Sequence, residues 1–136
     1  MKSIEVFAQV LYVSRLAIGC DSSVVKAIVQ VARRHNAAHG ITGALMFDGE
    51  RFCQLLEGPP DEVTPLMQRI TEDPRHTDVR LLHSGVANGA RVATRWRSGY
   101  CEPSSFEAFD AGDASGPGSA AALDAFRHLL PLADLD

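Results

Sequence analysis

Three polar side chains that lie in apolar surroundings are the residues of this sequence best suited to chemistry. Tyr12 lies in the first apolar segment, Gln54 lies within RFCQLLEG at residues 51–58, and Asn36 lies in a segment of helical periodicity. A phenol and two carboxamides supply both hydrogen-bond donors and acceptors, but they are costly to bury unless each finds a partner. The nature of those partners is the main question that the sequence raises.

The partners of these side chains can be of two kinds. Buried polar groups are usually satisfied within the protein, which predicts a backbone carbonyl for Tyr12, the helix end for Asn36 and a bond across a hairpin for Gln54. Alternatively, a small planar ligand with donors and acceptors along one edge satisfies all three groups in a mostly apolar cleft. Because the three groups come from three different elements, their coincidence favours a ligand.

The elements that position these groups follow from hydrophobic periodicity. Residues 24–39 form a helix that Gly40 ends, Asp48-Gly49 is typical of a hairpin turn, and a second helix begins at Pro59-Pro60-Asp61-Glu62 and ends at Asp73-Pro74. Strands are predicted over residues 4–14, 42–47, 52–57, 79–83 and 96–101. The order βαββαββ predicts an α+β, ferredoxin-like fold with both helices on one face of the sheet.

The first helix has a solvent side and an apolar side. On a helical wheel His35 falls in the middle of the apolar side, and Asn36 lies on its flank. The solvent side carries Lys26, Gln30, Arg33 and Arg34.

The C-terminal region differs in composition from the rest of the chain. We predict a domain over residues 1–102, a linker over 103–118 and an amphipathic helical tail over 119–136. The tail is expected to cover the second sheet face, either of its own sheet or of a partner.

Length, charge and cysteine content exclude several classes of protein. A chain of 136 residues is expected to form one domain, and its three cysteines show no CxxC spacing, which favours a reducing compartment such as the cytoplasm. The net charge of −4, without basic clusters, argues against nucleic-acid binding. No stretch is long and apolar enough for a membrane helix, so no membrane association is expected.

A series of short motifs, in order and at these separations, resembles the BLUF domain, a blue-light sensor that uses flavin. The resemblance runs from about residue 4 to residue 102. The motifs are Tyr12-Val13-Ser14, His35-Asn36, Ile41-Thr42-Gly43-Ala44-Leu45, Phe52-x-Gln54-x-Leu56-Glu57-Gly58, Asp73-x-Arg75-His76 and Trp96. The resemblance implies FAD or another flavin such as FMN, bound non-covalently between the two helices, with C-terminal helices on the opposite sheet face.

The resemblance also implies roles for particular residues. Tyr12 is expected to be the photoactive tyrosine, Gln54 the switch glutamine, and Asn36 the residue that holds the pyrimidine edge of the flavin. The other expected cofactor-binding residues are Ser14, His35, Arg69, Asp73, Trp96 and Ser98.

Several of these positions have alternative interpretations. Arg69 and Asp73 are one helical turn apart and can form a surface ion pair. The sequence favours a solvent-exposed turn for Arg75-His76, and a lone Trp on a strand is more often a packing residue.

The resemblance implies a light-driven reaction. Excited flavin takes an electron from Tyr12, and because a phenol with a pKa near 10 holds its proton at neutral pH, electron and proton transfer must be coupled. Gln54 relays the proton, because its amide donates and accepts. The pair then returns with Gln54 in a new hydrogen-bonding arrangement, which red-shifts the flavin absorption.

The signalling output is less determined by the sequence. Ser98 stands where family members often carry Met, two residues after the tryptophan, so the signal path from Gln54 into the sheet is in question. We expect no output domain and no metal site, and a signal carried by contacts with a partner protein or between subunits, with the last strand and tail as the switching element.

Two other functions were weighed against a light sensor. A flavin-free interaction module on the same fold is disfavoured by the joint presence of Tyr12, Asn36 and Gln54. An enzyme that uses His35 or His76 as acid or base is disfavoured because the sequence has no carboxylate pair, nucleophile elbow or metal-spaced histidines.

Overall fold

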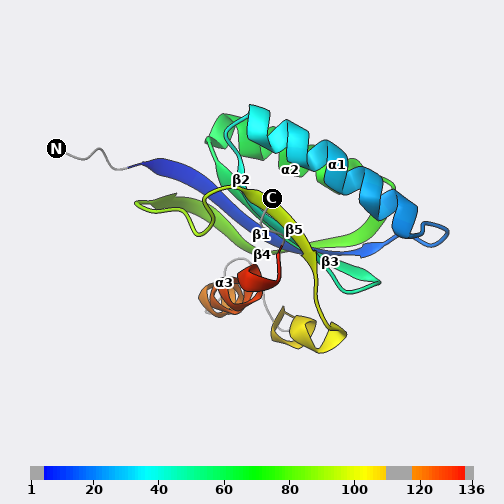
Figure 1. The fold of residues 1–136 in the computed structure, drawn as a ribbon. Coiled ribbons are helices and arrows are strands. Elements are labelled where there is room, and N and C mark those ends of the chain that lie inside the picture. The colour runs from blue at the N-terminus through cyan, green and yellow to red at the C-terminus, as the bar shows by residue number, and fades with distance from the viewer. Residues whose placement is uncertain (1–4, 110–117, 134–136) are drawn as a thin grey trace.

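The computed structural model describes residues 5–109 and 118–133. Figure 1 shows a twisted sheet with two helices on one face and a third helix on the other. In chain order the elements are β1 (Val6–Leu16), α1 (Ser22–Ala38), β2 (Thr42–Phe47), β3 (Arg51–Gly58), α2 (Pro60–Glu72), β4 (His76–Asn88), β5 (Trp96–Tyr100), the 3-10 helix η1 (Pro103–Phe109), α3 (Gly118–Leu129) and the 3-10 helix η2 (Leu130–Leu132). The α+β, ferredoxin-like prediction is confirmed.

The sheet places the functional strands side by side. Its five strands have the order β4-β1-β3-β2-β5, and β5 runs parallel to β2 while the other pairs are antiparallel. In the pairing of β1 with β3, Tyr12 lies directly opposite Gln54. Because side chains alternate between faces along a strand, both side chains lie on the face that α1 and α2 cover.

The hairpin between β2 and β3 forms for the reason that the sequence predicts. The Asp48 carboxylate accepts hydrogen bonds from the backbone N–H groups of Glu50 and Arg51, at 2.9 and 2.7 Å. Gly49 follows in the left-handed region, with φ of 107°. This turn fixes the register that carries Gln54 into the sheet.

Gly43 on β2 permits an unusually close approach of two strands. Its φ is 142°, and a Cβ added there would lie 1.8 Å from the carbonyl oxygen of Leu55 on β3. No side chain fits at that distance, so the pairing of β2 with β3 requires glycine at this position.

Helix α1 begins and ends with recognisable capping groups. The Asp21 side chain accepts from Ser23 N at 2.9 Å at the start, and Gly40 has a φ of 70° just after the end. Arg33, predicted on the solvent side, is only partly exposed, and its guanidinium hydrogen-bonds Ser98 on β5. Val31 on the apolar side is 55% exposed, because it borders an open cavity.

The hydrophobic core occupies both faces of the sheet. Under α1 and α2, side chains of the central strands pack against Val25 and Val63. On the other face, Leu11 and Leu55 pack against Phe126 of α3. The tail therefore covers its own sheet, which was one of the two predicted outcomes, and Figure 1 shows α3 on the face opposite α1 and α2.

The predicted linker over residues 103–118 is wrong in its first part. Residues 103–109 form η1, and Phe106 and Phe109 are buried against the sheet together with α3. The packed domain therefore continues past residue 102. Residues 110–117 lie outside the described residues.

Strand β4 is longer than the sequence predicts, with His76–Asn88 in place of residues 79–83. As an edge strand it pairs with β1 through backbone groups, from Leu16 opposite His76 to Val6 opposite Asn88. Its polar and small residues need no apolar alternation for that pairing, so hydrophobic periodicity does not reveal them.

Among the described residues, no helix is long and apolar enough to span a membrane.

Candidate functional site

A cavity of about 310 Å³ opens between α1 and α2, above β1 and β3. Its walls are mainly apolar, and polar side chains from five elements and the connection after α2 reach into it. The lining residues are Tyr12, Ile28, Val31, Ala32, His35, Asn36, Leu45, Phe52, Gln54, Leu66, Arg69, Ile70, Asp73, Arg75 and His76. An apolar cavity with a few convergent polar groups has the character of a small-molecule site.

Tyr12 and Gln54 lie at the floor of this cavity and form a hydrogen-bonded row with Trp96 beside it. Gln54 Nε2 donates to the Tyr12 hydroxyl at 2.6 Å, and Trp96 Nε1 donates to Gln54 Oε1 at 3.0 Å. All three side chains are at most 5% exposed. Tyr12 therefore bonds Gln54 and not the backbone carbonyl that the simpler interpretation predicts, and Trp96 is part of the row as well as of the packing.

The indole of Trp96 fixes which way the Gln54 amide points. An indole N–H can only donate, so it must face the amide oxygen, and the amide nitrogen must then face Tyr12. In the opposite orientation two N–H donors would confront each other. The amide of Gln54 therefore has one favoured orientation while Trp96 remains beside it.

The Tyr12 phenol holds its proton strongly. Burial raises the pKa of Tyr12 well above its ordinary value near 10, and the hydrogen bond from Gln54 opposes this shift only in part. The phenol is therefore neutral at any physiological pH, and it cannot lose an electron readily unless its proton leaves as well.

A second hydrogen-bonded row ends at Asn36. The Arg69 guanidinium lies 2.9 Å from His35 Nε2, and His35 Nδ1 lies 3.1 Å from Asn36 Oδ1. Because arginine only donates, His35 must accept at Nε2 and donate from Nδ1. This fixes the Asn36 amide with its oxygen toward His35, and its buried Nδ2 is left without a hydrogen-bond partner.

Arg69 and Asp73 do not pair with each other. Arg69 contacts His35, whereas Asp73 accepts from Arg75, with an Nη2 to Oδ2 distance of 2.6 Å. The Arg75 side chain also lowers the pKa of Asp73 through this hydrogen bond. The alternative of an Arg69–Asp73 ion pair is therefore wrong.

The segment Arg75-His76 is the part of the cavity that sequence reasoning missed. His76 is half-buried, its Nδ1 lies 2.9 Å from Ser14 Oγ, and its Nε2 donates to the carbonyl of Ile70. Both Arg75 and His76 line the cavity, so the prediction of a solvent-exposed turn is wrong. Ser14 is not a lining residue but holds His76 in place.

Ser98 lies outside the lining of the cavity. Its hydroxyl accepts from Arg33 Nη2 at 3.3 Å, and the same guanidinium lies 5.6 Å from the ring centre of Trp96. Arg33 therefore connects Ser98 to the outer face of Trp96, through a polar bond on one side and a cation–π contact on the other.

The predicted site residues thus fall into three groups. Most of them line one cavity: Tyr12, His35, Asn36, Gln54, Arg69 and Asp73. Trp96 hydrogen-bonds Gln54 and Ser14 hydrogen-bonds His76, both of which line that cavity, whereas Ser98 is not among its lining residues.

Comparison with known proteins identifies the family. The sequence model of the family described as "BLUF: Sensors of blue-light using FAD" matches residues 7–99. Photoactivated adenylate cyclase subunit beta of Euglena gracilis is 43% identical over 85 residues, which are 62% of this chain and 10% of that protein. The blue light- and temperature-regulated antirepressor BluF of Escherichia coli strain K12 is 40% identical over 55 residues, which are 40% of this chain and 14% of that protein.

A solved structure agrees with this match. The structure described as "BlrB - a BLUF protein, dark state structure" superimposes with a TM-score of 0.69 at 25% sequence identity, covering 90% of this chain and 96% of that one. The chain spans only about a tenth of the length of the cyclase subunit that it matches. With its family match over residues 7–99, its fold and its photoactivated relatives, the chain belongs to the BLUF family of blue-light sensors.

Proposed function

We propose that this chain holds FAD non-covalently in the cavity between α1 and α2, and that blue light switches the hydrogen bonds of Gln54. The observation that carries the proposal is the Trp96–Gln54–Tyr12 row at the floor of the cavity. FAD is favoured over FMN because the family description names it.

The cavity suits the ring system of a flavin. Ile28, Leu66 and Ile70 supply apolar walls for a flat aromatic system. Asn36 Nδ2 is buried without a partner, and such a group is costly unless a ligand acceptor such as a ring carbonyl completes it. Arg69 at the same cavity offers donors to a phosphate or a hydroxyl of the cofactor side chain.

The mechanism depends on the protonation and orientation of two side chains. When bound, a flavin excited by blue light supplies a strong oxidant. Tyr12 is neutral, so the loss of its electron requires the loss of its hydroxyl proton. Gln54 presents its donor nitrogen to that hydroxyl, so it must rotate or tautomerise before it accepts the proton.

Rotation of Gln54 is coupled to the position of Trp96. After rotation, the oxygen of the Gln54 amide accepts from Tyr12 and its nitrogen faces Trp96 Nε1. Two N–H donors then meet at the distance of the present 3.0 Å bond, so the indole must move away. The amide and the indole thus form one two-state element, whose first state is the arrangement in the structure.

Absorption spectroscopy tests the function directly. The purified protein is expected to be yellow, to show a red shift of its flavin bands under blue light, and to recover in darkness. Chromatography of the released cofactor against FAD and FMN standards distinguishes the two flavins. A colourless protein that cannot be reconstituted with either flavin would refute the proposal.

We expect Asn36→Ala to weaken FAD binding roughly tenfold or more, since a hydrogen bond to a buried group is lost. Fluorescence quenching of FAD during titration measures the change in Kd. Asn88→Ala is the matched control, because Asn88 is exposed at the end of β4. Equal affinity of the two variants would show that Asn36 does not contact the cofactor.

Replacing Trp96 by Phe should reduce the amplitude of the light-induced red shift. The variant keeps an aromatic ring but loses the bond that favours the present orientation of Gln54. A hydrogen bond of about 1 kcal/mol corresponds to about a fivefold change in the ratio of the two orientations, so more molecules are rotated before illumination. A wild-type difference spectrum would contradict the coupling of Trp96 to Gln54.

We also propose where the signal goes. The protein is expected to act in the cytoplasm and to alter its contacts with a downstream protein or a second copy of itself. Relatives of this chain include much longer cyclase subunits, so an effector that responds to a BLUF domain is a reasonable partner. Size-exclusion chromatography of dark and illuminated samples tests whether light changes self-association. An elution profile that does not depend on light would exclude signalling through a second copy of the chain.

A further inference from the structure

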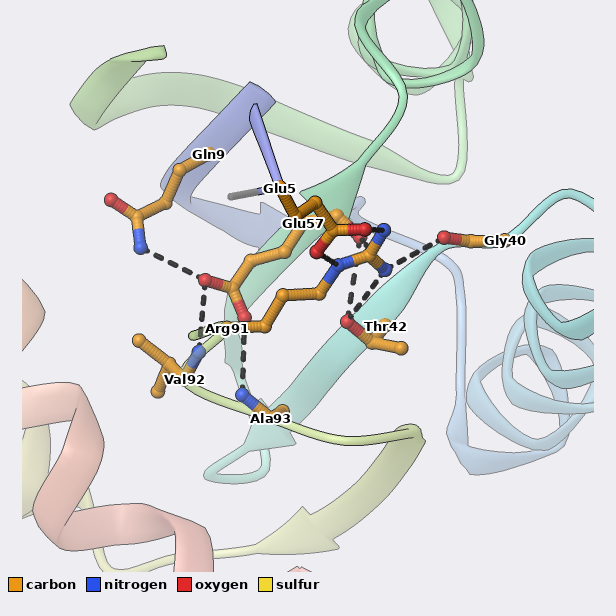
Figure 2. A network of polar contacts seen from close by, with 8 residues as sticks. All are labelled: Glu5, Gln9, Gly40, Thr42, Glu57, Arg91, Val92 and Ala93. Atoms are coloured by element: carbon orange, nitrogen blue, oxygen red, sulfur yellow. Dashed lines mark hydrogen bonds and ion pairs between the residues drawn. The ribbon is translucent and has the colours of Figure 1, made fainter. Parts of the chain in front are cut away.

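Glu57 is a buried carboxylate that the photochemical row does not use. It lies three residues after Gln54 on β3, so its side chain points to the opposite face of the sheet, toward α3. Its exposed fraction is 0%, and such a carboxylate is costly to bury unless it is well hydrogen-bonded. Figure 2 shows that it is: Gln9, Val92 and Ala93 converge on its two oxygens.

The carboxylate holds the segment that leads into β5. Val92 N donates to Glu57 Oε2 and Ala93 N donates to Glu57 Oε1, both at 3.1 Å. Three residues after Ala93 the chain reaches Trp96, which donates to Gln54. Strand β3 therefore holds the segment of residues 92–96 at two points. Gln54 bonds Trp96 on one face of the sheet, and Glu57 bonds Val92 and Ala93 on the other.

Arg91 secures the same segment from the other side. Its guanidinium forms a two-point ion pair with Glu5, at 2.8 and 3.0 Å. Its Nη1 also donates to the carbonyl of Gly40 at 2.8 Å, and to Thr42 Oγ1 and the Glu57 carbonyl, both at 3.2 Å (Figure 2). Arg91 is thus fixed to the sheet. If Trp96 moves, the backbone between Arg91 and Trp96 must change its conformation.

Glu57 is also the end of a hydrogen-bond chain that reaches α3. Gln9 Nε2 donates to Glu57 Oε2 at 2.9 Å, which turns Gln9 Oε1 toward His83 Nε2 at 3.0 Å. His83 must therefore donate from Nε2, and its Nδ1 accepts from the hydroxyl of Ser119 on α3. Burial lowers the pKa of His83, which favours the neutral ring that this order of donors requires.

We propose that Glu57 is a positioning residue, and that the chain Glu57–Gln9–His83–Ser119 couples the position of Trp96 to the seating of α3. The inference rests on the proposed function, because it takes the movement of Trp96 as its input. When Trp96 leaves Gln54, residues 92–95 shift and the two N–H bonds to Glu57 weaken. The carboxylate then shifts while Gln9 Nε2 remains its donor, and the bonds from Gln9 to His83 and from His83 to Ser119 carry the shift to α3.

The chain is suited to coupling because Gln9, His83 and Ser119 each donate in one direction only, toward Glu57. A buried carboxylate that loses donors must recover them or become costly, so its rearrangement is driven by a substantial free energy. Helix α3 also contacts the sheet through the apolar side chains of Ala122, Phe126 and Leu129, and apolar contacts tolerate small shifts of the helix. Ser119 therefore gives α3 its directional contact with this chain.

Hydrogen exchange of α3 in the dark and in the light tests the proposal. In the wild type we expect the exchange of residues 119–132 to differ between the two conditions. In Ser119→Ala we expect this difference to disappear and the dark-recovery time to change by about threefold or more, as the loss of one hydrogen bond allows. The amplitude of the red shift should be unchanged, because the cavity is intact.

Further variants separate coupling from a merely structural effect. Ser119→Thr keeps the hydroxyl and should restore the light-dependent exchange, whereas His83→Phe keeps a ring without nitrogens and should behave like Ser119→Ala. The controls are Ser104→Ala in η1 and His128→Phe in α3, both at exposed positions.

The outcomes distinguish this inference from the proposed function. A wild type without a red shift would refute the function itself. A wild type that responds to light, together with a Ser119→Ala variant that keeps the full light-dependent exchange of α3 and the wild-type recovery time, would refute the coupling alone.

Discussion

Tyr12→Phe is expected to leave the purified protein yellow and to abolish its light-induced red shift. The substitution removes only the hydroxyl, so the ring still packs in the sheet and the rest of the cavity lining is unchanged. Gln54 loses its partner at 2.6 Å, and no phenol proton remains to be transferred. The light-minus-dark difference spectrum measures the effect, and it should fall to the baseline.

The matched control for this prediction is Tyr100→Phe. It removes the same hydroxyl from a tyrosine that is 68% exposed on β5, and it should leave the difference spectrum as in the wild type. A Tyr12→Phe protein with a full-sized red shift would show that another residue supplies the electron and proton.

Gly43→Ala should lower the free energy of unfolding by roughly 3–5 kcal/mol, the range of severe backbone strain and steric overlap. The new Cβ would lie 1.8 Å from the carbonyl oxygen of Leu55, and the φ of 142° is strained for any residue with a side chain. Relief requires β2 to separate from β3, which carries Gln54. Urea denaturation followed by circular dichroism measures the loss.

Gly85→Ala is the control for the glycine substitution. A Cβ at residue 85 on the edge strand β4 meets nothing within 4 Å. The free energy of unfolding of the variant should therefore lie within about 1 kcal/mol of the wild-type value. Similar unfolding midpoints for the two variants would mean that β2 adjusts without strain, and that the close approach is not a requirement of the fold.

The parts of this fold that could be predicted from the sequence are those with local signals. The Asp48-Gly49 turn, the helix that ends at Gly40 and the alternating strands all leave marks within a few residues. Tyr12 and Gln54 could each be placed on the apolar side of its own strand because side-chain alternation follows from strand geometry. The structure adds that they face each other in register.

The parts that could not be predicted depend on contacts between distant residues. Phe106 and Phe109 lie in a short 3-10 helix next to a segment of linker-like composition. This helix is stabilised by packing on a sheet face that is built from distant residues. His76 reads as an exposed residue until Ser14 and Ile70 are brought to it by β1 and α2. Ser98 was assigned by its position in a motif, and Arg33 on a helical wheel, and neither method shows that they bond each other.

The backbone contact at Gly99 has a consequence for protein engineering. A Cβ there would lie 2.6 Å from the carbonyl oxygen of Leu132 and 2.8 Å from Ala133 Cα, and Ala133 forms a bridge with Gly99. Two backbones in direct contact have no side-chain rotamers between them to absorb a displacement. An output module fused to the chain at Ala133 would therefore be displaced together with β5, the strand that carries Trp96.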